Sequence, residues 1–142
     1  MQVEVAKLLD IRQAARLLDI EAKDVEELVS LGYLRPASGP SVDGFPEWKF
    51  DVDGIDALLE MVRERVVDLM LTPLDMLISA GAVIQEMERH GLSVGHFVNT
   101  IMEGKIVPLE REIGLLSWLP RRGFSWFAFS KEQVMKYLRV RT

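Results

Sequence analysis

Apolar residues recur at helical spacing in short segments of this 142-residue chain, and turn residues separate the segments. Two segments share one ending. "LVSLGYLRP" (28–36) and "TIMEGKIVP" (100–108) both run into a glycine, then an apolar residue and a proline at two-residue steps. Glycine lets a chain leave a helix through a left-handed conformation without steric penalty. The pattern predicts that helices end at Gly32 and Gly104 and that extended segments follow.

The similarity extends in both directions from these endings. Upstream, "LLDIRQAARLL" (8–18) matches "LISAGAVIQEM" (77–87); downstream, "WKFDVDGIDALL" (48–59) matches "FAFSKEQVMKYL" (127–138). The offset between the copies grows from 69 to 72 to 79 residues, which places two insertions in the second copy. Matches in the same order indicate a tandem repeat more strongly than one shared helix end does. We expect copy A at residues 1–71 and copy B at residues 72–142.

Each copy is predicted to start with a capped helix. Asp10 and Ser79 follow a short apolar lead-in, and their side chains can accept from free N–H groups of the first turn. A tight turn and a second helix come next. Two strands would then form a wing, at residues 33–36 with 47–50 in copy A and 105–109 with 126–129 in copy B.

A third helix should close each copy. Asp51 and Ser130 are its predicted caps, and Gln133 in "SKEQ" could complete a capping box. In copy A we expect this helix to run from Val52 to about Leu69, with an apolar stripe that packs against copy B or its own core, or else forms a dimer. Thr72 and Pro73 would restart the chain.

Helix, turn, helix, two-stranded wing and helix is the order of a winged helix-turn-helix. The stretch "IRQAARLLDIEAKDVEELVSLGYLRP…WKFDVDGIDALL" resembles the excisionase-like or MerR-like DNA-binding domain, through its alanine pair, its glycine-apolar step and its capped last helix. The resemblance covers residues 8–60 and, more loosely, 77–140. It implies a fold that is mainly α with small β wings, as two tandem winged helix-turn-helix units. It also implies double-stranded DNA binding, with the second helix in the major groove and the wing near the backbone.

Charge separates the two copies. The whole chain carries −5, yet residues 1–71 hold 8 basic and 15 acidic residues (−7), and residues 72–142 hold 9 and 7 (+2). The last stretch, 104–142, holds 8 basic and 3 acidic residues (+5). Such asymmetry predicts different partners for the two halves.

The second helix of copy A is acidic where a DNA reader would be polar or basic. Its outward positions hold four carboxylates and one lysine, and phosphate would repel them. This face is either a solvated surface, with acids favourable near a helix N-terminus, or a docking face for a basic protein partner. The docking candidates are Asp24, Glu26 and Glu27.

Copy B offers better DNA-binding candidates. Ser93 is the expected cap of its second helix, Gly95 permits close backbone approach, and His96 and Asn99 are candidates for the outward face. Asparagine can make a bidentate contact to adenine, so Asn99 is the first choice as a base reader. Further DNA-binding candidates lie at the helix exit, at the wing tip "PRRG" and on the third helix: Lys105, Arg121, Arg122 and Lys131. Lys136, Arg139 and Arg141 extend this basic character.

The motifs indicate no enzyme. His90 and His96 are six residues apart, whereas metal ligands on one helix face are three or four apart. The stretch "DVDGID" (51–56) begins like a calcium loop, but its glycine is at the fourth place and not at the sixth. The chain has no cysteine, no apolar run of membrane-spanning length and no signal peptide pattern, which fits a cytoplasmic protein. We expect no cofactor and no metal.

The sequence therefore predicts a DNA-binding module of the kind found in transcription regulators, excision factors or transposition target-selection proteins. Helix 2 and the wing of copy B would make most of the contact. The alternative is a protein-protein interaction adaptor that keeps the winged-helix fold without binding DNA, because fold does not imply function.

Overall fold

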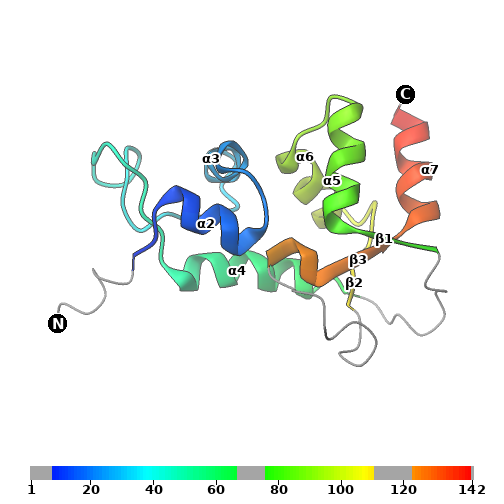
Figure 1. The fold of residues 1–142 in the computed structure, drawn as a ribbon, viewed down its shortest axis with the longest axis horizontal. Coiled ribbons are helices and arrows are strands. Elements are labelled where there is room, and N and C mark those ends of the chain that lie inside the picture. The colour runs from blue at the N-terminus through cyan, green and yellow to red at the C-terminus, as the bar shows by residue number, and fades with distance from the viewer. Residues whose placement is uncertain (1–7, 67–75, 111–122, 142) are drawn as a thin grey trace.

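The computed structural model describes residues 8–66, 76–110 and 123–141. Figure 1 shows three helices toward the N-terminal end and three helices with a small sheet toward the C-terminal end. The N-terminal elements are α2 (Ile11–Leu18), α3 (Ala22–Ser30) and α4 (Val52–Arg63). The C-terminal elements are β1 (Leu77–Ser79), α5 (Ala80–Arg89), α6 (Val94–Met102), β2 (Leu109–Glu110), the 3₁₀ helix η2 (Gly123–Trp126), β3 (Phe127–Ser130) and α7 (Lys131–Arg141). The prediction of a mainly α fold with small β elements is confirmed.

The helix ends follow the local sequence. Asp10 caps α2 by accepting from the N–H of Gln13 at 2.8 Å, and the Gln13 side chain accepts in return from the N–H of Asp10 at 2.9 Å. The predicted caps of α4 and α5 form as well, through Asp51 and Ser79. Gly32 and Gly104 adopt φ of 84° and 77°, as the repeated helix ending requires.

The same strand pairing occurs in both halves. β3 is the central strand of the sheet and runs antiparallel to β1 and β2. Ile78 of β1 pairs with Phe129 of β3, and Leu9 forms an isolated bridge with Phe50. Under the repeat offsets of 69 and 79 residues, Leu9 corresponds to Ile78 and Phe50 corresponds to Phe129, so the two pairs are equivalent. The apolar lead-in before each first helix therefore pairs at an equivalent position, as strand β1 in the C-terminal half and as a single bridge in the N-terminal half, which the sequence pattern did not predict.

The predicted first wing strands are much shorter in the structure. In copy A the wing is reduced to one bridge, Ser38 with Lys49, and in copy B β2 begins only at Leu109. The N–H groups of Tyr33 and Leu34 donate to the carbonyl of Leu28, at 3.0 and 3.2 Å. They close the end of α3 and so are not available for strand pairing.

Helix α4 is also shorter than predicted. It ends at Arg63 rather than near Leu69, because the N–H groups of Arg65 and Val66 bond to the carbonyls three residues before them. Such bonds tighten the last turn. Thr72, Pro73 and the 71/72 boundary lie outside the described residues.

The two halves share one hydrophobic core. Phe97 of α6 makes edge-to-face contacts with Phe124 and Phe129, with ring centroids 5.6 Å apart in each pair. In the stripe of α4, Leu58 and Val62 are fully buried within the same core. The stripe therefore packs inside the chain, and α4 contacts α6.

Gly123 seats the C-terminal half against α2. It has φ of 60°, and a Cβ there would overlap the backbone of Leu18.

Gly123→Ala should lower the free energy of unfolding by about 2–3 kcal/mol, because it combines a left-handed conformation with a clash against backbone. Urea denaturation measures this. The control is Gly81→Ala in α5, where a Cβ meets nothing within 4 Å; it should be neutral or stabilising. If the two variants change the free energy of unfolding equally, Gly123 does not pack closely against Leu18.

Candidate functional site

Helix α6, which the sequence analysis predicted to read DNA, has no exposed residue between Val94 and Met102. It contacts α3, α4 and α5. A recognition helix must present several side chains to base edges in the major groove. Six of the nine residues of α6 are buried, and the other three, His96, Asn99 and Met102, are half-buried. In this arrangement α6 packs mainly against other parts of the protein.

Glu27 of α3 reaches across to the N-terminus of α6. Its Oε1 accepts from the backbone N–H of Gly95 at 3.1 Å, and its Oε2 accepts from the Ser93 hydroxyl. Ser93 is also the predicted N-cap, accepting from the N–H of His96 at 3.2 Å. First-turn N–H groups lack partners within the helix and carry its positive dipole end, so a carboxylate there is stabilising. Glu27 thus caps α6 from another helix.

Gly95 lets the two helices approach. A Cβ at this position would lie 2.6 Å from Oε2 of Glu27 and would overlap the side chain of Leu31. The sequence predicts a close backbone approach to DNA at Gly95. In the structure the group that approaches is α3.

The polar side chains of α6 are bonded within the protein. Oδ1 of Asn99 accepts from the hydroxyl of Tyr33, just beyond the end of α3. Nε2 of His96 lies 2.6 Å from the hydroxyl of Tyr137 in α7, and the Thr100 hydroxyl donates to the His96 carbonyl at 2.7 Å. Base reading by His96 or Asn99 would first require these contacts to break.

The three docking candidates of α3 lie in different environments. Glu27 is engaged with α6, and Asp24 is only 8% exposed, with Oδ2 accepting from the N–H of Glu21 at 3.4 Å. Burial raises the pKa of the Asp24 carboxyl. Glu26 is exposed. Of these three residues, only Glu26 presents its carboxylate to an outside partner.

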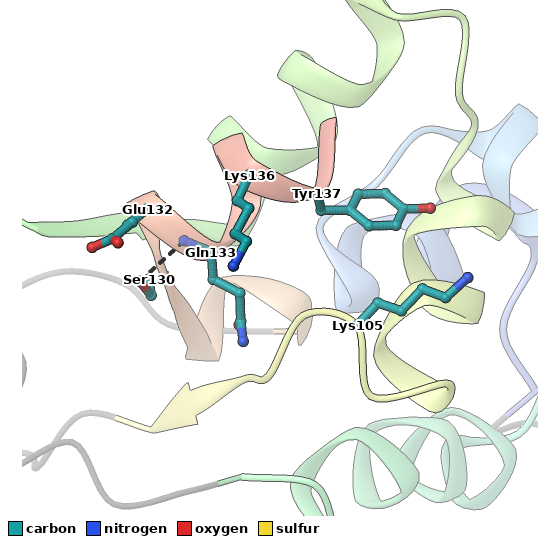
Figure 2. A pocket seen from close by; sticks show the side chains of 6 residues that line it. All are labelled: Lys105, Ser130, Glu132, Gln133, Lys136 and Tyr137. Carbon is teal, nitrogen blue, oxygen red and sulfur yellow. Dashed lines mark hydrogen bonds between the residues drawn. The ribbon is translucent and has the colours of Figure 1, made fainter. Parts of the chain in front are cut away.

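Basic side chains gather where the chain leaves α6 and where α7 begins. A hollow of about 500 Å³ opens there, and Figure 2 shows its lining residues: Lys105, Ser130, Glu132, Gln133, Lys136 and Tyr137. We call it the lysine hollow. In Figure 2 the Glu132 carboxylate points away from both lysines. Lys105 pairs with Glu103 at 3.5 Å, but both side chains are exposed, and such pairs contribute little.

Gln133 fixes one wall of the lysine hollow. Its N–H donates to Oγ of Ser130 at 3.3 Å, which agrees with the predicted cap. Its side-chain oxygen accepts from the N–H of Val107 at 2.8 Å. The side chain thus ties α7 to the segment before β2 rather than reaching back to complete the capping box.

The remaining sequence candidates divide into two groups. Lys131 is exposed at the first position of α7. Arg121 and Arg122, the predicted wing tip, lie outside the described residues.

Two tyrosines of this region are not predicted by the sequence pattern. Tyr33 and Tyr137 bond to the polar side chains of α6. The repeat alignment carried a signal for Tyr137, because it places that residue opposite Leu58 of copy A. A hydroxyl at an otherwise apolar core position needs a partner, and His96 supplies it.

No family model, no curated protein and no solved structure matches this chain. The resemblance to winged helix-turn-helix domains therefore stays a prediction from sequence pattern. Among the described residues, no helix has the length and apolar character to cross a membrane. Within the same ranges, no group of three or more histidine or acidic side chains is placed to hold a metal ion.

Replacing Glu27 tests the contact between α3 and α6. Glu27→Ala should lower the free energy of unfolding by about 1–3 kcal/mol, because the Gly95 N–H and the Ser93 hydroxyl lose their acceptor. Chemical denaturation followed by circular dichroism measures the loss. The neighbouring change Glu26→Ala removes an exposed carboxylate of the same helix and should stay within about 0.5 kcal/mol. If the two variants are equally stable, Glu27 does not cap α6.

Proposed function

We propose that the chain is a DNA-binding module that holds the phosphate backbone through its C-terminal half, with α6 as an internal scaffold. One observation carries the proposal: Lys105 and Lys136 come from different segments and line one hollow. Lys131 and Arg139 are exposed on the helix that forms one side of it. The expected reading helix is thus replaced by a lysine surface beside it.

The chemistry of the lysine hollow suits a phosphate group. The two ammonium groups supply charge, and the side-chain amide of Gln133 carries polar hydrogens at its wall. Each lysine that neutralises a phosphate releases condensed counterions, which favours binding at low salt. The charge of +5 over residues 104–142 adds long-range attraction.

Contacts of this kind position a protein on DNA without reading sequence. Asn99 is bonded to Tyr33, so we expect phosphate contacts rather than base contacts from the described residues. We therefore expect low sequence preference from this surface. Any strong preference would have to come from elsewhere, and the paired arginines of the wing are the first candidates.

The adaptor reading is the second candidate function. The exposed carboxylate of Glu26 in α3 favours it, because an acidic helix face would be repelled by phosphate and attracted by a basic protein. The two functions are compatible if each half serves its own partner.

The lysine hollow can be tested by charge reversal. At about 50 mM salt, the double variant Lys105→Glu and Lys136→Glu should bind a mixed-sequence duplex at least about tenfold more weakly, and the slope of log K against log salt should fall by about two. Fluorescence anisotropy with a labelled duplex measures both.

The matched control reverses two exposed cations of the N-terminal half, Arg12→Glu and Lys23→Glu, with the same change in net charge. It should retain most of the affinity. An equal loss in the control would mean that net charge, rather than the lysine hollow, drives binding. If the unaltered chain shows no salt-dependent binding, the proposed function is wrong.

A further inference from the structure

The loop of residues 38–47, between the two bridged segments of copy A, is held in one shape by its own hydrogen bonds; we call it the acidic loop. The carbonyl of Gly39 accepts from three N–H groups at 3.0–3.1 Å, those of Val42, Asp43 and Gly44. The Asp43 carboxylate accepts from the N–H groups of Gly39 and Phe45, at 3.1 and 3.2 Å, and from the Ser38 hydroxyl at 2.8 Å. The loop is therefore ordered before any partner binds.

This ordered loop exposes its apolar side chains. Phe45 is 61% exposed and Val42 is 52% exposed, the two highest values among the exposed large apolar residues of the described chain. Aromatic side chains on a rigid support are efficient binding anchors, because little conformational freedom remains to be lost on association. The fold itself gains little from keeping Phe45 in water.

The sequence on either side of the anchor is rich in carboxylates. Residues 38–56 contain five acidic residues against Lys49, a formal charge of −4: Asp43, Glu47, Asp51, Asp53 and Asp56. All five are exposed. A complementary partner must offer a recess for the ring with cations at its edge.

The lysine hollow has these properties. It is an open hollow of about 500 Å³, and Lys105, Lys136 and Tyr137 are among the residues that line it. In Figure 1 the acidic loop (cyan) lies at the opposite end of the molecule from α7 (red). The loop of one chain therefore cannot enter its own hollow, whereas the loop of a second copy can.

We propose that the protein associates head to tail, with the acidic loop of one copy docked in the lysine hollow of the next. Phe45 would enter the hollow, and Glu47 would face Lys105 and Lys136. The two surfaces are different patches of the chain, so the contact is heterologous and can repeat into open chains. The inference does not depend on DNA binding, although phosphate and the loop would compete for the same lysines.

A complementation experiment tests the proposal. Sedimentation velocity of the full chain at low salt should show association that grows with protein concentration and weakens as salt increases. Phe45→Ser removes the aromatic anchor of the acidic loop. The double variant Lys105→Glu and Lys136→Glu reverses the charge of the lysine hollow. Each variant alone should lose association at least about tenfold. Mixed one to one, they should form a dimer that grows no further, because one intact loop and one intact hollow remain.

Leu17→Gln is the control, since it removes an exposed apolar side chain of α2 outside the loop, and it should associate as the unaltered chain does. The proposal is overturned if the chain stays monomeric at every concentration or if the two variants do not combine. DNA binding by the Phe45→Ser variant separates the two proposals, because its lysine hollow is intact.

Discussion

The carboxylate of Glu27 on the first turn of α6 is the contact on which the arrangement of the two halves depends. It satisfies a backbone N–H and a cap hydroxyl that belong to a helix of the other half. It also requires glycine at position 95, because any side chain there would occupy the space of the carboxylate. The bond between Tyr33 and Asn99 supports the same contact. These two contacts help to hold α6 in the shared core. The candidate binding surfaces are therefore on the loops and on α7.

Under the repeat offset of 72, the residues of this contact show how the copies differ. Gly95 corresponds to Lys23, Asn99 to Glu27, and Ser93 to Glu21, the N-cap of α3. A carboxylate of copy A thus meets a glycine N–H of copy B, a pairing that two identical copies could not make in the same way. Leu9 with Phe50 and Ile78 with Phe129 pair at equivalent positions, while the two second helices are complementary to each other.

Local features could be predicted from the sequence because their determinants lie within a few residues of each other. The caps at Asp10 and Ser93 and the glycine at position 104 are of this kind. The lead-in strands and the contact between α3 and α6 join residues more than 40 positions apart, so no local pattern specifies them. A signal for burial was nevertheless present: "VGHFVNTIM" contains only three polar side chains and no charged one, too few for a solvent-facing stripe.

The exchange rate of the Gly95 backbone amide tests the central claim most directly. Amides in the first turn of a helix normally exchange fast, because no helical carbonyl accepts from them. With Glu27 as acceptor, the Gly95 amide should exchange slowly by NMR, whereas the Lys23 amide at the equivalent position of α3 should exchange fast. Glu27→Ala should bring Gly95 to the rate of Lys23. Fast exchange at Gly95 in the unaltered protein would show that α3 does not cap α6.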